Sequence, residues 1–131
     1  MHATHLLIVA HGSRRETSND EVRRLAERVR TLCGPEVAGV EVAFLELAEP
    51  SIPEGLARCA AAGADEIVVF PYFLAAGTHV AQDIPEAVGE FAQAHPQVCV
   101  RLTPHLGASD ALPGAILAVA LSGGQAVPAT A

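Results

Sequence analysis

Four short apolar segments, rich in Val and Ile and bounded by turn residues, recur along the chain at 6–10, 40–45, 66–70 and 98–102. Unbroken apolar runs of this length predict β-strands. Because the runs have no polar face, they are typical of parallel strands that are covered on both sides.

The longer stretches between these runs have the pattern of helices. Val22, Leu25 and Val29 recur at helical spacing, which predicts the first helix. Ser18 and Glu21 have the spacing of a capping box, in which each side chain binds a free backbone N–H, so we expect this helix to begin at Ser18.

Three further helices are predicted by their start signals. Ser51 and Glu54 repeat the capping-box spacing, and Gly63 is suited to the end of that second helix. The stretch 83–86, with a proline in the expected first turn, predicts the start of a third helix, and 110–121 predicts a fourth.

The resulting order, β-α-β-α-β-α-β-α, predicts an α/β fold with a four-stranded, mainly parallel sheet and helices on both faces. A chain of 131 residues is of the usual size for one domain. We expect that domain to span 1–122. The Gly- and Pro-containing stretch 123–131 is predicted to be a flexible tail.

One polar residue with metal-binding or acid/base chemistry follows each predicted strand: His11, Glu46, His79 and His105. Ligands of such folds bind beyond the carboxyl ends of the strands, where all four residues are expected. Imidazole and carboxylate groups gathered there predict a metal site or an acid/base site.

The residues around these candidates leave alternatives open. Gly12 would let the loop after the first strand turn tightly or approach a ligand, but His11 could also be an ordinary hydrogen-bonded loop residue. Glu46, flanked by apolar residues, could be partly desolvated or could be a solvated loop acid, and Glu49 is expected to be a solvated loop acid. Ser13 lacks the setting of a hydrolase nucleophile.

The aromatic-rich segment 70–73 leads toward His79. A flat apolar ligand could lie against Phe70 and Phe73. Both rings could equally belong to the core, which is the more common position for aromatic residues at a strand end.

The charged residues of the chain exclude several functional classes. The net charge is −7 and the chain has no lysine, which excludes a Walker-type phosphate loop and a Schiff-base mechanism. An acidic chain without a broad basic face is a poor nucleic-acid binder. Six arginines cluster between 14 and 30, where they form either the solvated face of the first helix or, for Arg14 and Arg15, a patch for an anion.

The sequence also indicates where in the cell the protein is expected. No apolar run approaches the length of a membrane span, and the first residues lack the pattern of a signal peptide. We therefore expect a soluble, cytoplasmic protein without a membrane partner.

Three motifs carry a resemblance to a known family: HGSR at 11–14, FLE at 44–46 before PSI at 50–52, and FL at 73–74 with G-x-HV at 77–80 and DIP at 83–85. In this order they resemble the small class II tetrapyrrole chelatases, the sirohydrochlorin cobaltochelatase and ferrochelatase group of the CbiX and SirB type. The resemblance implies a single flavodoxin-like domain that pairs as a homodimer.

The resemblance also implies an activity: insertion of Co²⁺, Fe²⁺ or Ni²⁺ into sirohydrochlorin, in cobalamin or siroheme biosynthesis, without ATP or an organic cofactor. His11 and His79 match the family's histidines, which bind the metal or accept the pyrrole protons, and Glu46 matches an assisting glutamate. Donors to the substrate carboxylates are then expected from Gly12, Ser13, Arg14, Gly77 and Thr78.

The same resemblance leaves His105 without a match, and we expect it to be a surface residue. Two other functions stay open. A non-catalytic carrier of metal or tetrapyrrole would need the same site but no turnover. A flavodoxin-like nucleotide or phosphoanion module would use the Gly12 loop and not His79.

Overall fold

A four-stranded parallel sheet forms the centre of the molecule. The structure is a computed structural model that describes residues 3–129, apart from the side chain of His79. The strands are β1 (Thr4–Ala10), β2 (Gly39–Phe44), β3 (Glu66–Pro71) and β4 (Cys99–Leu102), in the spatial order β2-β1-β3-β4. Every neighbouring pair is parallel, so the four predicted strands and the predicted sheet are confirmed.

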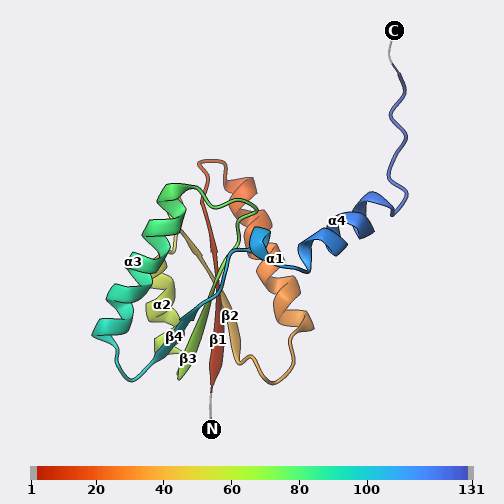
Figure 1. The fold of residues 1–131 in the computed structure, drawn as a ribbon. Coiled ribbons are helices and arrows are strands. Elements are labelled where there is room, and N and C mark those ends of the chain that lie inside the picture. The colour runs from red at the N-terminus through yellow and green to blue at the C-terminus, as the bar shows by residue number, and fades with distance from the viewer. Residues whose placement is uncertain (1–2, 130–131) are drawn as a thin grey trace.

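Helices cover both faces of this sheet, as Figure 1 shows. They are α1 (Glu16–Leu32), α2 (Ile52–Ala61), α3 (Thr78–Ala94) and α4 (Leu112–Ala120), and a short 3₁₀ helix, η1 (Leu106–Ala108), precedes α4. The helices α2 and α3 share one face with each other, and α1 lies on the opposite face. The predicted α/β class is therefore confirmed.

Each face has its own hydrophobic core, because strand side chains alternate between the two sides. Leu7 and Val69 point toward α2 and α3 and are fully buried. Ile8, Val42 and Phe44 point toward α1. In β1 and β2, burial on both faces explains the mostly apolar sequence of the strands.

The end signals predicted for α2 are all present. The Ser51 side chain accepts a hydrogen bond from the Glu54 amide, and the Glu54 carboxylate accepts one from the Ser51 amide. These bonds hold the pKa of the Glu54 carboxyl below its ordinary value. Gly63 follows the helix with φ +97°, a conformation that glycine adopts without strain.

The predicted capping box of α1 is wrong. The helix begins at Glu16, so Ser18 lies inside its first turn, and its N-cap Arg15 makes no side-chain capping bond. Asn19, which is fully buried, holds the preceding loop instead, as described below. This tertiary contact outweighs the local capping signal.

The predicted start of α3 is also wrong. The helix begins at Thr78 and not near Asp83, so Pro85 lies inside the helix. Val80, Ile84 and Val88 recur at helical spacing and are buried against the sheet, and their packing outweighs the missing hydrogen bond at the proline.

The last helix, α4, stands away from the sheet (Figure 1). It is close to the predicted fourth helix, but none of its residues is buried. Among the described helices, none is both long and apolar enough to cross a membrane. The predicted division into a domain at 1–122 and a tail at 123–131 stays a prediction.

Candidate functional site

His11 and Glu46 lie side by side because the pairing of β1 with β2 continues past both strands. The Leu45 amide donates to the Ala10 carbonyl (2.9 Å), and the Glu46 amide donates to the His11 carbonyl (3.0 Å). This parallel register brings the two residues to the carboxyl edge of the sheet at the same height. The strand order also places this edge where the chain changes direction between β1 and β3.

The two side chains are hydrogen-bonded to each other. His11 Nε2 lies 2.9 Å from Glu46 Oε2, and each side chain is 55% exposed. Of the two interpretations of Glu46, this exposure favours a solvated loop acid. Solvent access leaves both groups available to a ligand that enters from outside.

Gly12 permits this close approach. It has φ +94°, and a Cβ at this position would lie 1.8 Å from the Glu46 carbonyl oxygen. Both the backbone conformation and the contact require glycine. On the other side of the pair, Leu47 has φ +66°, a conformation that costs energy for a residue with a side chain.

A buried asparagine fixes the loop that follows Gly12. The Asn19 Oδ1 atom accepts a hydrogen bond from the Ser13 amide (2.9 Å), and its Nδ2 donates to the Ser13 carbonyl (2.8 Å) and to Glu16 (3.2 Å). The Ser13 amide is therefore engaged within the protein. Ser13 as a donor to a substrate stays a prediction that needs this bond to open.

The His11–Glu46 pair opens onto a groove with a volume of about 590 Å³. Leu45, Ile52 and Ala87 supply apolar lining from the β2–α2 segment and α3. Three carboxylates on α3 also line the groove: Asp83, Glu86 and Glu90. The lining therefore favours a cation over an anion.

These α3 carboxylates were missed by sequence reasoning. Asp83, Glu86 and Glu90 lie at helical spacing i, i+3 and i+7, which would have indicated a common face if the start of α3 had been placed correctly. Asn19 was also missed, although an asparagine near a helix start is a common partner for free loop amides.

The loop after β3 reaches the same site. The Phe73 ring contacts the His11 ring edge-on, with 6.3 Å between centroids, and also packs partly against the core. Phe70 packs partly on the other face of the sheet. Of the two open interpretations, core packing applies to both rings, and Phe73 in addition borders the site.

His79 lies in the first turn of α3, which places its backbone at this edge of the sheet. Its side chain lies outside the described part of the structure, so its proximity to His11 stays a prediction. Gly77 is the N-cap of α3 and Thr78 is its first residue, and both are exposed. Among the described side chains, no group of three His, Cys, Asp or Glu residues is arranged to hold a metal ion.

The remaining candidates lie outside the groove. Arg14 and Glu49 are exposed, as expected for Glu49. Arg23 pairs with Glu16 and Asp20 (2.5 and 2.8 Å), which supports a solvated face for α1. His105 is half-buried and not on the surface as expected, and it lines a separate cavity of about 150 Å³.

The chain is similar in sequence to known proteins. The CbiX family model matches residues 5–120. The chain is 43% identical over 84 residues to a sirohydrochlorin cobaltochelatase of Methanopyrus kandleri, covering 64% of this chain and 57% of that protein. It is 36% identical over 102 residues to the chloroplastic sirohydrochlorin ferrochelatase of Arabidopsis thaliana, covering 78% of this chain and 44% of the relative.

A solved structure has the same fold. The sirohydrochlorin chelatase SirB from Bacillus subtilis subspecies spizizenii, in complex with cobalt, superposes with a TM-score of 0.78 at 29% identity. The match covers 89% of this chain and 49% of SirB. The chain thus spans about half the length of these relatives.

Proposed function

We propose that this chain, which belongs to the CbiX family, inserts a divalent metal ion into sirohydrochlorin, the substrate named for its relatives. The observation that carries the proposal is the His11–Glu46 pair, held 2.9 Å apart at the mouth of an open groove. Co²⁺ and Fe²⁺ are the metals that the names of the relatives suggest, and Ni²⁺ is a third candidate.

The spacing of the pair fits two ligands of one metal ion. A first-row divalent ion lies ~2.1 Å from imidazole nitrogen and carboxylate oxygen, so two such ligands at a right angle are about 3 Å apart. His11 Nε2 and Glu46 Oε2 have this separation already. Metal binding would replace the proton that the two atoms share.

The same pair can then take part in proton transfer. Insertion of M²⁺ into the macrocycle releases two protons from pyrrole nitrogens, while the metal leaves His11 and Glu46. Once the metal has moved to the ring, the pair regains its site for one proton, and His79 is the proposed second acceptor. An imidazole is suited to this task near neutral pH.

The charge of the groove supports different positions for the two proposed substrates. Asp83, Glu86 and Glu90 attract a metal cation and repel the carboxylates of a tetrapyrrole. The macrocycle would therefore lie over the mouth of the groove, with its acidic groups toward Gly12, Arg14, Gly77 and Thr78. Ser13 contributes its amide only when the bond to Asn19 opens.

We further propose that the reaction needs neither ATP nor an organic cofactor, and that it takes place in the cytoplasm without a nucleic-acid or membrane partner. The absence of lysine, which a Walker-type phosphate loop requires, supports independence from ATP. The active form is proposed to be a homodimer, which would match the greater length of relatives such as SirB, of which the match covers 49%.

The test is anaerobic incubation of the full chain with sirohydrochlorin and Co²⁺, Fe²⁺ or Ni²⁺, followed by absorbance. The proposal predicts metal insertion well above the rate without protein. Tight binding of metal or tetrapyrrole without acceleration would favour a carrier. Thermal stabilisation by nucleotides but not by Co²⁺ would favour a nucleotide-binding module.

A further inference from the structure

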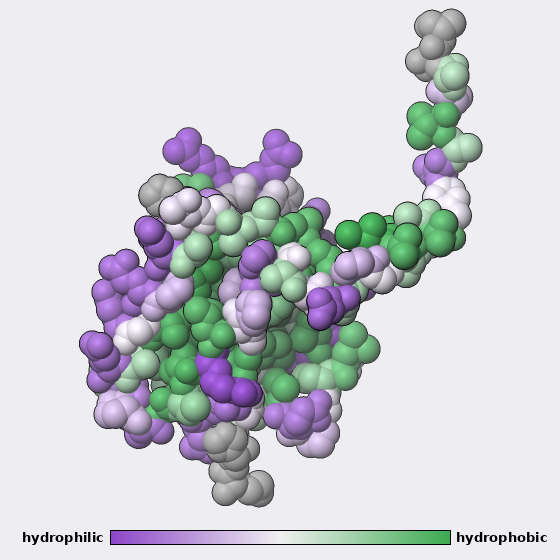
Figure 2. Space-filling model, in the orientation of Figure 1, coloured by the Kyte–Doolittle hydropathy of each residue, from purple (hydrophilic) through white to green (hydrophobic). Residues whose placement is uncertain are grey.

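The helix α4 is an apolar surface without a covering partner in the described structure. Ile116, Leu117 and Val119 are 58%, 60% and 74% exposed, and no charged residue follows Asp110 in the chain. Figure 2 shows α4 as a largely hydrophobic arm that leaves the body of the protein. A helix that is apolar on all sides is normally buried, so α4 requires a cover.

Part of one face of the sheet is not covered by a helix in the described part of the chain. Val68 and Phe70 alternate along β3 with the buried residues Ile67 and Val69, so they point to the face opposite α2 and α3. Both are only half-buried. On this face α1 packs against β2, and no described helix packs extensively against β3 or β4.

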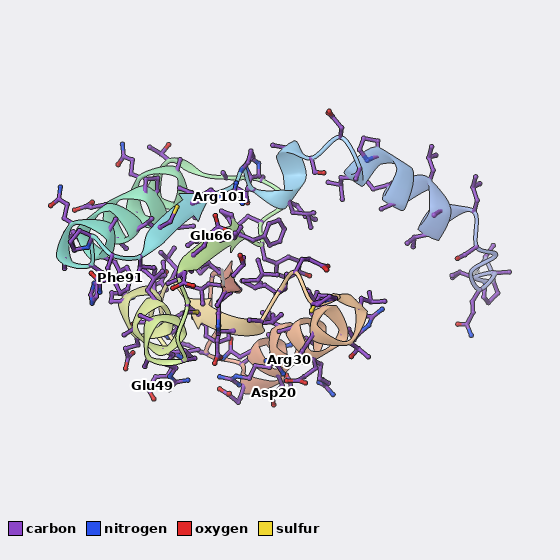
Figure 3. The ribbon with its side chains drawn as sticks, turned by 90° about the horizontal axis from the view of Figure 1, so that it is seen from below. Asp20, Arg30, Glu49, Glu66, Phe91 and Arg101 are labelled. Carbon is purple, nitrogen blue, oxygen red and sulfur yellow. The ribbon has the colours of Figure 1, made fainter. Side chains whose placement is uncertain are left out.

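We call this surface the open sheet face and define it by Leu6, Val68, Phe70, Cys99 and Arg101. Figure 3 shows Arg101 beside Glu66 on these strands, away from α1. Their side chains form an ion pair at 3.1 Å, which neutralises the two charges on this face. The open sheet face is therefore apolar apart from one internally paired site.

A groove borders the open sheet face and could receive part of a helix. It lies between α1 and the end of β3 and has a volume of about 460 Å³. Its lining combines Val22, Leu25 and Tyr72 with the charged residues Glu21, Arg24 and Arg28, so its apolar part is confined to one side. The nine residues of α4 form a cylinder about 14 Å long and roughly 10 Å wide, which is larger than this groove. The groove would therefore take only part of α4, and the rest of the helix would lie on the open sheet face.

The connection before α4 directs the helix away from its own sheet (Figure 1). The Gly107 amide donates to the Phe73 carbonyl (2.9 Å), and a Cβ at Gly107 would lie 1.6 Å from the Leu74 carbonyl oxygen. The next turn is closed by bonds of the Ala111 amide to the Ser109 side chain and of the Leu112 amide to the Ser109 carbonyl. These contacts hold the segment that leads into α4.

We propose that α4 of one copy packs on the open sheet face of a second copy, beside α1, and that the second copy returns the same contact. Each copy has one uncovered helix and one uncovered face, so a twofold exchange leaves neither exposed. The proposal deepens the homodimer of the proposed function and rests on that pairing, but not on metal insertion.

The area and the charge of the proposed contact both support a second copy of the chain as the partner of α4. A specific interface needs about 1,200 Å² in total, or roughly 300 Å² from each of the four surfaces that a reciprocal exchange covers. Side chains such as Ile116, Leu117 and Val119 each supply on the order of 60–120 Å² when buried. Because α4 is uncharged and the open sheet face is internally neutralised, the net charge of −7 on each chain does not oppose this contact.

The test replaces two α4 residues on one side of the helix, Ile116→Lys with Val119→Lys, and uses Leu32→Lys as the matched control. Leu32 is 87% exposed at the end of α1 and lies outside the proposed contact. Light scattering after size exclusion gives the mass. We expect about 27 kDa, twice the 13.5 kDa of one chain, for the unchanged protein and the control, and one-chain mass for the double variant.

Reaction of Cys99 with a thiol reagent at pH 8 gives a second readout. The assay uses a Cys33→Ser background. Burial raises the pKa of the Cys59 thiol to about 12, so that thiol stays protonated and Cys99 reports alone. In the dimer, α4 of the second copy covers Cys99, and the double variant should react at least about tenfold faster than the control.

The outcomes are distinct. One-chain mass of the unchanged protein overturns the exchange, whether Cys99 is protected by its own α4 or reacts freely. A dimer that survives the double substitution with unchanged Cys99 reactivity also overturns it, because the interface then lies elsewhere. Metal insertion is assayed in parallel, so a failed chelatase proposal leaves the mass and reactivity results interpretable.

Discussion

At the scale of single residues, the site depends on backbone geometry as much as on its reactive groups. The hydrogen bonds that extend the β1–β2 pairing bring His11 to Glu46, and Gly12 allows their backbones to approach. The reactive pair and its spacing are consequences of this contact. A change at Gly12 should therefore disturb the site without removing any reactive group.

Gly12→Ala should lower the free energy of unfolding by about 2 kcal/mol or more and reduce the rate of metal insertion, because the new Cβ displaces the Glu46 carbonyl. Gly63→Ala is the matched control, with a similar φ of +97° but no neighbour within 4 Å. It should cost about 1 kcal/mol and leave insertion unchanged. Urea unfolding and insertion assays measure both, and equal effects of the two variants would refute the role of the contact.

The sequence identifies His11 and Glu46 as a candidate pair because both follow apolar runs that end at one edge of the sheet. Their 2.9 Å separation could not be predicted, because it depends on the register of β1 and β2 and on the turn at Gly12. The exposure of Glu46 could not be decided from the sequence, because apolar neighbours along the chain do not have to cover a side chain in space.

At the scale of elements, packing decides where helices begin. The local signals at Ser51 are confirmed, because the capping box that they predict is formed at the start of α2. At α1 and α3, by contrast, the loop held by Asn19 and the buried row containing Val80 and Ile84 move the starts away from the local signals. The strands were predicted more accurately because each is marked by a short, mostly apolar run bounded by turn residues.

Asn19→Ala should lower the free energy of unfolding by about 2 kcal/mol, because it leaves the Ser13 amide and carbonyl without their partner. It should also slow metal insertion, since the loop beyond Gly12 is released. Ser18→Ala is the control and should change stability by no more than about 0.5 kcal/mol. If Ser18→Ala lowered the free energy of unfolding more than Asn19→Ala, the result would support the capping box predicted from the sequence.

At the scale of the whole molecule, the net charge opposes binding of the proposed tetrapyrrole substrate. The chain carries −7, and the arginines of α1 are partly neutralised by neighbours such as Glu16, whose pKa is held low by hydrogen bonds from Arg23 and Asn19. The carboxylates of the groove add local repulsion for an acidic substrate. Salt should therefore favour substrate binding, because it screens this repulsion.

Raising the ionic strength should lower the KM for sirohydrochlorin about two- to threefold, as screening weakens the repulsion. Replacement of Glu86 and Glu90 by Gln should lower the KM at low salt and reduce its dependence on salt. Steady-state kinetics at several salt concentrations measure both effects. A KM that rises with salt would mean that attraction by Arg14 and its neighbours dominates.

His11 is proposed to bind the metal ion during insertion. This role is tested by comparing the initial rates of metal insertion by His11→Ala and His95→Ala, under anaerobic conditions with sirohydrochlorin and Co²⁺. His95 stacks on Phe91 at the far end of α3, outside the groove. We expect the initial rate to fall by about 100-fold or more in His11→Ala and to stay near the unchanged protein's rate in His95→Ala. Full insertion activity in His11→Ala would contradict it.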